Sequence, residues 1–316
     1  MQTRTLGKTD LEIVPLVLGG NVFGWTIDEA KSFEILDAFV DRGFNCIDTA
    51  DVYSTWVPEH QGGESETIIG KWFARSGKRS RVAIATKVGW EMKSGGKGLS
   101  KKYILEEVEQ SLKRLQTDRI DLYQSHLDDE KTPFEETLGA YARLIEQGKV
   151  RAIGASNYKG ARLEEAIELA ERSGLPVYRT LQPEYNLHDR KGYEEGLAPV
   201  AAKFGLGVIP YWSLASGFLT GKYRTLDDAK GAKREARLAK YFDERGMRIL
   251  KALRKVSDES GAEQASVSLA WLLAQPTITA PIASATSVKQ LQALFAAVEL
   301  TLTGGQLQEL TDASAY

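Results

Sequence analysis

The chain has 316 residues, a formal net charge of −2, 42% hydrophobic residues and 27% charged residues. This composition is typical of a globular protein, and the near-zero charge gives no reason to expect nucleic acid or an anionic membrane as a partner. No apolar stretch has the length and flanks of a signal peptide or of a membrane span. The single cysteine, Cys46, cannot form an internal disulfide, so we expect a cytoplasmic protein.

Short apolar runs, separated by longer stretches, recur along the whole chain. Residues 4–13 come first and are expected to form a small hairpin. The runs that follow are too short for helices and lack clean alternation, so they are predicted to be strands buried on both faces. In chain order the predicted strands are residues 16–18, 46–47, 82–85, 120–123, 150–153, 178–181, 207–209 and 278–282.

Helical spacing of apolar residues occupies intervals between these strands. Residues 104–115, 134–145 and 163–170 each place apolar side chains on one helical face. The segment 132–135, Thr-Pro-Phe-Glu, predicts the start of the second of these helices, with a threonine N-cap, a proline at the first position and a capping-box glutamate. The chain therefore alternates strand and helix.

Eight strands alternating with helices predict a single (β/α)8 TIM barrel over residues 1–316, with the short β-hairpin at its N-terminus. The alternation alone also allows a doubly wound open sheet. Against that alternative, no Gly-x-Gly-x-x-Gly turn follows the first strand. The densely charged segment 224–245 resists assignment: we expect either a solvated surface loop and helix or a lid over a site.

Four polar residues are predicted at or just beyond strand ends: Asp48, Tyr53, Lys87 and His126. Active sites of (β/α)8 barrels lie at the carboxyl ends of the strands. A tyrosine is a poor acid at neutral pH, because its reference pKa is about 10. An ammonium group ~4 Å away, at an effective dielectric constant of ~20, contributes about 4 kcal/mol, or roughly three pKa units. We expect Lys87 to lower the pKa of Tyr53, Asp48 to hold the lysine, and His126 to orient a carbonyl group or help deliver the proton.

Each of these residues also has an ordinary structural explanation. Asp48 suits a turn, Tyr53 suits an aromatic anchor, and a lysine such as Lys87 is usually solvated when it follows a strand. His126 is harder to explain in this way, because the chain contains only three histidines. Their combination at strand ends favours a site.

Other reaction classes fit the sequence less well. One cysteine and scattered histidines give no zinc-ligand spacing, so no metal is expected. The acidic run 128–130 is better explained by a following helix dipole than by a cation. The glycine-rich segment 95–98 lacks the first glycine and the Ser/Thr of a phosphate loop, and no Gly-x-Ser-x-Gly elbow is present.

A series of motifs in register covers nearly the whole chain. In order they are Leu18–Gly20, Ile47–Tyr53, Gly63–Glu66, Thr86–Lys87, Asp121–His126, Gly154–Asn157, Gln182–Asn186 and Tyr211–Tyr223. These motifs resemble the aldo-keto reductase superfamily. The resemblance implies a barrel that binds NADP(H) without a Rossmann fold and reduces aldehydes or ketones. In that reading Tyr53 is the general acid, Lys87 and Asp48 tune it, and His126 orients the substrate carbonyl.

The resemblance also implies which residues bind the cofactor. Ser156, Asn157 and Gln182 match positions that hydrogen-bond the nicotinamide carboxamide, and Tyr211 matches the aromatic residue that stacks on the nicotinamide ring. Part of the last motif matches the loop that folds over the pyrophosphate. The implied cofactor-binding residues are Gly20, Asn21, Val22, Asp48, Ser156, Asn157, Gln182, Tyr211, Trp212, Ser213, Leu214, Gly217, Lys222, Ser284 and Gln290.

The sequence departs from the family pattern at two places. Trp212-Ser213 stands where many relatives have Ser-Pro. Leu294 stands where relatives often carry an asparagine that contacts adenine, and residues 282–294 contain no arginine to bind a 2′-phosphate. A preference for NADPH over NADH therefore rests mostly on the resemblance.

We expect an NADP(H)-dependent oxidoreductase acting on a small carbonyl substrate. Trp25, Trp56 and Trp90, with Phe23, follow predicted strands closely enough to contact this substrate alongside Tyr53 and His126, although each also suits loop packing. The alternative is a catalytically weak, NADPH-sensing regulatory subunit resembling the barrel β-subunits of potassium channels. A barrel of another class, such as a metal-dependent hydrolase, lacks its ligands. Substrate identity and oligomeric state stay open.

Overall fold

The centre of the protein is an eight-stranded parallel sheet. A computed structural model describes all 316 residues, and the strand order is β10-β3-β4-β5-β6-β7-β8-β9. Each predicted strand has a counterpart in this sheet, shifted by a few residues at most ends. The strands are β3 (Val17–Gly19), β4 (Cys46–Asp48), β5 (Ala83–Val88), β6 (Ile120–Ser125), β7 (Val150–Ser156), β8 (Thr180–Gln182), β9 (Gly207–Val208) and β10 (Ile282–Ala283).

The sheet closes on itself between its last and first strands. Val208 forms a parallel bridge with Ile278, and the amide of Ile282 donates to the carbonyl oxygen of Pro210 over 2.9 Å. Because β10 also pairs with β3, the eight strands form a ring. The prediction of a (β/α)8 TIM barrel is confirmed, and the open sheet is excluded.

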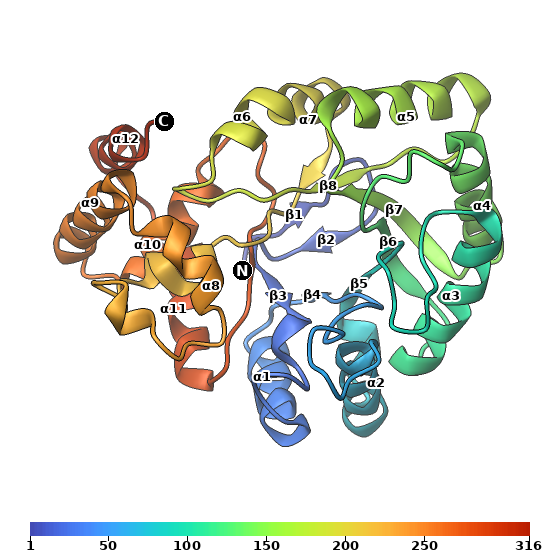
Figure 1. Ribbon diagram of the computed structural model, residues 1–316, viewed down its shortest axis with the longest axis horizontal. Helices are drawn as coiled ribbons and strands as arrows, with labels where there is room; N and C mark the ends of the chain where they lie inside the picture. The colour runs from blue at the N-terminus through green and yellow to red at the C-terminus, as the bar shows by residue number, and fades with distance from the viewer.

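Helices surround this ring on its outer side (Figure 1). Their apolar faces pack on the outward side chains of the strands, which are buried on both faces as predicted. The helices are α1 (Glu29–Asp41), α2 (Glu64–Ser76), α3 (Lys101–Leu115), α4 (Phe134–Glu146), α5 (Gly160–Ser173), α6 (Lys191–Gly196), α7 (Ala198–Phe204), α8 (Glu235–Leu238), α9 (Glu244–Ser260), α10 (Gln264–Leu273), α11 (Val288–Glu299) and α12 (Gly304–Ala313). None of them combines the length and the apolar content needed to cross a bilayer.

The predicted N-terminal hairpin is present and lies at one end of the barrel. Its strands β1 (Arg4–Thr5) and β2 (Glu12–Ile13) pair antiparallel. Leu6, Leu11 and Ile13 pack with inward-facing residues of the barrel strands in a separate buried cluster. The hairpin therefore fills the amino-terminal end of the barrel and leaves the carboxyl ends of the strands free for a site.

One local prediction was wrong. No side chain caps the start of α4, because the Thr132 hydroxyl donates to the carboxylate of Asp129 over 2.7 Å instead. Asp129 also accepts from the backbone amide of Leu99, so it organises the loop before the helix. The capping pattern did not account for a competing carboxylate five residues before the helix start.

The charged segment 224–245, called the rim segment below, contains only short helical turns. These are η4 (Asp227–Ala229), α8 and η5 (Ala239–Tyr241). Arg237 and Lys240 of this segment form ion pairs with Glu184, which follows β8. The segment therefore packs across the carboxyl side of the barrel, and the simple prediction of a solvated surface loop does not describe it.

Candidate active site

A fully buried charge, Lys87 on β5, lies at the carboxyl ends of the strands. Its ammonium group donates to the Oδ2 atom of Asp48 over 2.7 Å, to the carbonyl oxygen of Thr49 over 2.8 Å and to the hydroxyl of Tyr53 over 2.9 Å. Asp48 and Lys87 are 1% and 0% exposed. All three ammonium donors are thus used, and Lys87 is fixed between a carboxylate and a phenol.

Two glutamines hold the other oxygen of Asp48. Gln182 on β8 donates from Nε2 to Asp48 Oδ1 over 2.8 Å, and Gln124 on β6 donates to the same atom over 3.3 Å. Gln124 was quoted within a motif but given no role in the sequence analysis. Its place on β6, two residues before His126, was the available signal, because alternate residues of an extended chain face the same side. We call Asp48, Tyr53, Lys87, Gln124 and Gln182 the lysine network.

Burial dominates the acidity of Tyr53. Burial raises the pKa of Tyr53 to about 12, and the nearby Lys87 only partly offsets this rise. Lys87 lowers the pKa of Tyr53, as expected, but burial raises it by more, so the net shift is away from neutrality. The hydroxyl stays protonated, and its contact with Asp48 Oδ2 is long, at 3.4 Å. A protonated phenol with a weakly engaged hydrogen is suited to donate to a carbonyl oxygen.

His126 follows β6 directly and lies beside the tyrosine. The two ring centroids are 6.1 Å apart, and the histidine is 8% exposed. Burial, and secondly the charge of Lys87, lower the pKa of His126 well below its usual value. The imidazole is therefore neutral at pH 7, so it can orient a carbonyl group by a hydrogen bond without adding a second cation.

The residues matched to the nicotinamide end lie together at the carboxyl ends of β7 and β8. Ser156 and Gln182 are neighbours in the sheet register. Asn157 has a left-handed backbone with φ 56°, donates to the carbonyl oxygen of His126 over 2.8 Å and accepts from the hydroxyl of Tyr211 over 2.7 Å. The amide oxygen of Gln182 makes no hydrogen bond within the chain, so it is open to a ligand donor.

The loop that follows Tyr211 has donors without partners. The backbone amides of Trp212, Ser213 and Leu214 make no hydrogen bond within the chain, and the buried hydroxyl of Ser216 has none either. Lys222 lies against Gly217, where an added Cβ would meet its side chain at 3.2 Å. Free amides, a hydroxyl and a lysine make a set of donors that fits a pyrophosphate.

The remaining matched positions lie around β3 and β10. Gly20 to Val22 form the turn η1 directly after β3. Ser284 donates to the side-chain oxygen of Asn21 over 2.7 Å, which links the segments that follow the neighbouring strands β10 and β3. The amide oxygen of Gln290 accepts from the backbone of Thr286, so Gln290 keeps its amide nitrogen free. Leu294 is 3% exposed and packs in the core, so it offers no polar contact to an adenine.

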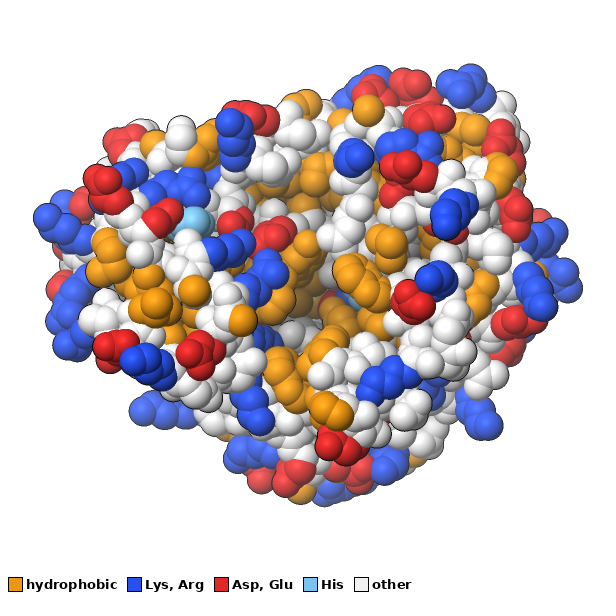
Figure 2. All heavy atoms as spheres, viewed as in Figure 1, with side chains coloured by type: hydrophobic (Ala, Val, Ile, Leu, Met, Phe, Trp, Pro, Cys, Tyr) orange, Lys and Arg blue, Asp and Glu red, His pale blue; other side chains and the backbone are white.

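Aromatic side chains surround the opening above Tyr53. Trp56 lies 5.3 Å from Trp25 and 6.0 Å from Tyr53, centroid to centroid, and Trp90 lies 5.3 Å from His126. Trp56 and Trp90 are 48% and 47% exposed. Figure 2 shows a hollow in this face of the molecule, rimmed by hydrophobic side chains. Phe23 takes no part, because it is fully buried in the main core.

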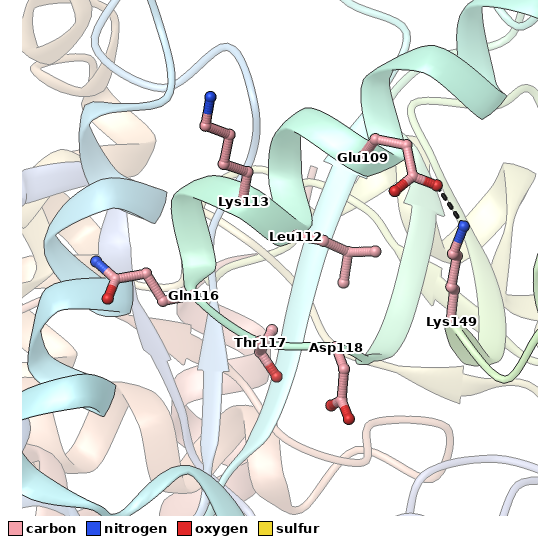
Figure 3. Close-up of a pocket in the computed structure, with 7 residues that line it drawn as sticks. All are labelled: Glu109, Leu112, Lys113, Gln116, Thr117, Asp118 and Lys149. Atoms are coloured by element: carbon pink, nitrogen blue, oxygen red, sulfur yellow. Dashed lines mark hydrogen bonds and ion pairs between the residues drawn. The ribbon is translucent and has the colours of Figure 1, made fainter.

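A second depression lies far from these residues. It is lined by Glu109, Lys113, Thr117, Asp118 and Lys149, among others, with Leu112 as its only apolar residue (Figure 3). Thr117 and Asp118 precede β6, so this depression is at the amino ends of the strands. It has the polar, shallow character of ordinary surface and carries none of the chemistry described above. No cluster of His, Cys, Asp and Glu could hold a metal ion.

Comparison with known proteins agrees with this geometry. The sequence model of the "Aldo/keto reductase family" matches residues 15–315. The "Uncharacterized oxidoreductase YrpG" of Bacillus subtilis (strain 168) is 39% identical, over 99% of this chain and 95% of the relative. A "Probable voltage-gated potassium channel subunit beta" of Arabidopsis thaliana is 34% identical, over 95% and 92%. An "L-glyceraldehyde 3-phosphate reductase" of Escherichia coli O157:H7 is 32% identical, over 92% and 86%. The chain therefore belongs to the aldo/keto reductase family.

Proposed function

We propose that the protein is an NADP(H)-dependent reductase of aldehydes or ketones. The observation that carries this proposal is the contact of the Lys87 ammonium with both Asp48 and the Tyr53 hydroxyl, at 2.7 and 2.9 Å. A buried lysine held against a phenol has little structural purpose, because a buried ion pair alone gives small net stability. It suits a tyrosine that must lose its proton during a reaction.

In this proposal Tyr53 donates its proton to the carbonyl oxygen of the substrate. The carbonyl carbon is reduced, its oxygen becomes a hydroxyl, and the phenolate left on Tyr53 is stabilised by the Lys87 ammonium. Asp48 keeps Lys87 charged, and the two glutamines keep Asp48 in place. His126, neutral in this environment, orients the carbonyl from the other side. The proton returns to Tyr53 from solvent after the alcohol leaves.

The cofactor-binding residues are proposals too. A nicotinamide cofactor supplies, when bound, the hydride for the carbonyl carbon. Ser156, Asn157 and Gln182 would hold its carboxamide, and Tyr211 would stack on its ring. The free amides after Tyr211, with Lys222, would hold the pyrophosphate. Residues 282–294 contain no arginine for a 2′-phosphate, so the preference for NADPH over NADH rests on the family pattern.

A second candidate function follows from one relative. The plant protein named as a potassium channel β-subunit is similar over nearly the whole chain, so a regulatory role that senses the cofactor fits the same fold. The relative named as an L-glyceraldehyde 3-phosphate reductase favours catalysis on an aldehyde. We favour catalysis, because burial keeps the Tyr53 hydroxyl protonated and Lys87 places a cation beside it.

A panel of carbonyl compounds tests the proposal. The purified protein is mixed with NADPH, or with NADH, and aromatic aldehydes, aliphatic aldehydes and ketones are added one at a time. Consumption of the reduced cofactor is followed by its absorbance, with cofactor binding measured separately by fluorescence. We expect turnover with aldehydes and tighter binding of NADPH. Tight binding without turnover of any compound would favour the regulatory function, and equal affinities would contradict the NADPH preference.

A further inference from the structure

Arg234 in the rim segment is a partly buried cation with no partner. Its guanidinium makes no ion pair and no hydrogen bond within the chain, and its Nη2 atom is fully buried. Burial, and secondly the charge of Arg237, lower the pKa of Arg234. A buried guanidinium nitrogen such as Nη2 of Arg234 is costly to leave unpaired unless an acceptor arrives.

Arg237, one helical turn away, has a structural role and provides a comparison for Arg234. It stacks over Trp212 at 4.2 Å, as Arg234 does at 5.0 Å. Arg237, however, pairs with Glu184 over 2.5 Å, and Glu184 is also contacted by Lys240. The rim segment is therefore held to the barrel by Arg237 and Lys240. Arg234 is not needed for that attachment.

The position of Arg234 links it to the opening above Tyr53. Its guanidinium lies 5.6 Å from the centre of the Trp25 ring, Trp25 contacts Trp56, and Trp56 contacts Tyr53. Arg234 is also close enough to Tyr53 and Tyr223 for their hydroxyl groups to affect its pKa. Lys and Arg side chains border the hollow on the side of α8 in Figure 2. The basic group and the catalytic phenol thus share one opening.

Trp212 helps to fix this arrangement. It has a left-handed backbone, with φ 55°, which is unusual for a bulky residue and indicates local strain. Its carbonyl oxygen accepts from the amide of Ala215 and from the side chain of Asn186, which holds the strained turn. The Trp212 ring then supports both arginines. Trp212 departs from the family pattern. Its ring therefore holds the Arg234 guanidinium beside the opening above Tyr53.

We propose that Arg234 binds an anionic group, a carboxylate or a phosphate, on the carbonyl substrate, and that the enzyme prefers such substrates over neutral ones. This inference rests on the proposed function, because it assigns the substrate class of the same site. A guanidinium binds both anions by paired hydrogen bonds, so either group satisfies the donors. The aromatic rings between Arg234 and Tyr53 suit an apolar middle part of the substrate.

The other anion that could reach Arg234 is a phosphate of the cofactor. The free amides of Trp212 to Leu214, with Lys222, already provide a separate donor set for the pyrophosphate. Arg234 instead contacts the rings of Trp25 and Trp212 and lies near Tyr53, on the substrate side of the proposed site. These contacts favour the substrate, and the experiment below separates the two ligands.

The test compares 4-formylbenzoate with its methyl ester, which differ in charge at the far end from the aldehyde. For the wild-type protein, kcat/KM is measured for both compounds at low ionic strength. Binding of both to the cofactor-loaded protein is measured by calorimetry, independently of turnover. We expect a preference for the carboxylate that Arg234→Gln reduces roughly 10- to 100-fold, because hydrogen bonds to charged groups have this strength. The ester and the KM of NADPH should stay within about twofold.

Two further variants complete the design. Arg234→Lys keeps the charge but not the paired donors, so it should recover part of the preference. Arg237→Gln is the matched control: Glu184 retains Lys240, and the preference for the carboxylate should persist. An equal loss for both aldehydes in Arg234→Gln would overturn the inference, as would a selective rise in the KM of NADPH. Reduction of the ester without any preference for the carboxylate would also refute it, while leaving the reductase proposal intact. Binding of the carboxylate through Arg234 without turnover would support it and contradict that proposal.

Discussion

Two layers of the site differ in how completely their polar groups are paired. In the lysine network every ammonium donor of Lys87 has an acceptor, and both oxygens of Asp48 accept hydrogen bonds. Around the opening, Arg234 has no acceptor, and Trp56 and Trp90 are about half exposed. The inner layer is built on strands, apart from Tyr53 in the loop after β4, whereas the outer layer is built on loops and the rim segment.

This difference indicates that the inner layer serves the reaction and the outer layer contacts the ligand. Strand residues are fixed by the sheet, so the groups of the inner layer are preorganised for one reaction. Loop residues around the opening leave donors and apolar surface for a ligand to cover. Substitutions in the inner layer should therefore cost stability and activity together, while those in the outer layer should change substrate preference alone.

The largest effect is expected for Lys87→Met. Removal of the ammonium leaves the Asp48 carboxylate buried without its cation, so the free energy of unfolding should fall by about 3–5 kcal/mol. Reductase activity should be lost, because the phenolate of Tyr53 has no stabilising charge. Urea unfolding and NADPH consumption provide the two measurements. Lys87→Met combined with Asp48→Asn should recover part of the stability but none of the activity. Full activity in either variant would contradict the expectation that inner-layer substitutions reduce activity.

A smaller effect is expected where Asp48 loses a hydrogen-bond donor. Gln182→Leu removes the 2.8 Å contact with Asp48 Oδ1 and should lower the free energy of unfolding by about 1–3 kcal/mol. Gln124→Leu is the matched control, since it removes the longer 3.3 Å contact to the same atom and should cost less. Denaturant titration of both variants shows which one loses more free energy of unfolding. A larger loss for Gln124→Leu would show that the distances do not rank the two donors.

The acid side of the stability profile should depend on His126. Its pKa is lowered by burial, so the folded protein binds this proton less readily than the unfolded chain does. The corresponding stability is present above the unfolded pKa of ~6.5 and is lost as the pH falls. Between pH 7 and 5.5 the loss should be about 1 kcal/mol, and His126→Asn should remove it. Urea titrations at both pH values, compared with wild type, measure the change. The same pH dependence in both proteins would contradict a buried neutral imidazole.

The smallest effect on stability is expected at the opening. Trp56→Ala should change the free energy of unfolding by no more than about 0.5 kcal/mol, because the side chain is half exposed. The KM of aromatic aldehydes should rise, whereas the KM of small aliphatic aldehydes should not. Thermal unfolding and steady-state kinetics with both substrate classes test this. A large loss of stability would show that Trp56 supports the fold, contrary to its assignment to the outer layer.

The barrel was predictable from sequence because its signals are local. Short apolar runs mark strands buried on both faces, and each of the eight runs has its strand in the sheet. The hairpin of residues 4–13 was equally accessible. Asp48, Lys87 and His126 were placed at strand ends by counting along each run, and the barrel topology then brings those ends together.

The remaining features depend on contacts between distant segments. The partner of Gln124 is Asp48, 76 residues away, and no spacing rule connects them. The pKa of Tyr53 depends on burial by the folded loops, which outweighs the lysine that the sequence pointed to. Phe23 and Arg234 show the same limit. Phe23, an aromatic residue expected at the opening, is in the core, and Arg234, a residue of a charged surface segment, is partly buried and unpaired.

The most direct test of the central claim is the activity of Tyr53→Phe. This change removes the hydroxyl and leaves the ring against Trp56, with Lys87 still paired to Asp48. The aldehyde that the wild-type protein reduces fastest is used, with NADPH binding measured by fluorescence in the same samples. We predict that kcat falls by roughly 100- to 10,000-fold while the dissociation constant of NADPH stays within about threefold. Undiminished reduction by Tyr53→Phe would contradict the assignment of Tyr53 as the proton donor.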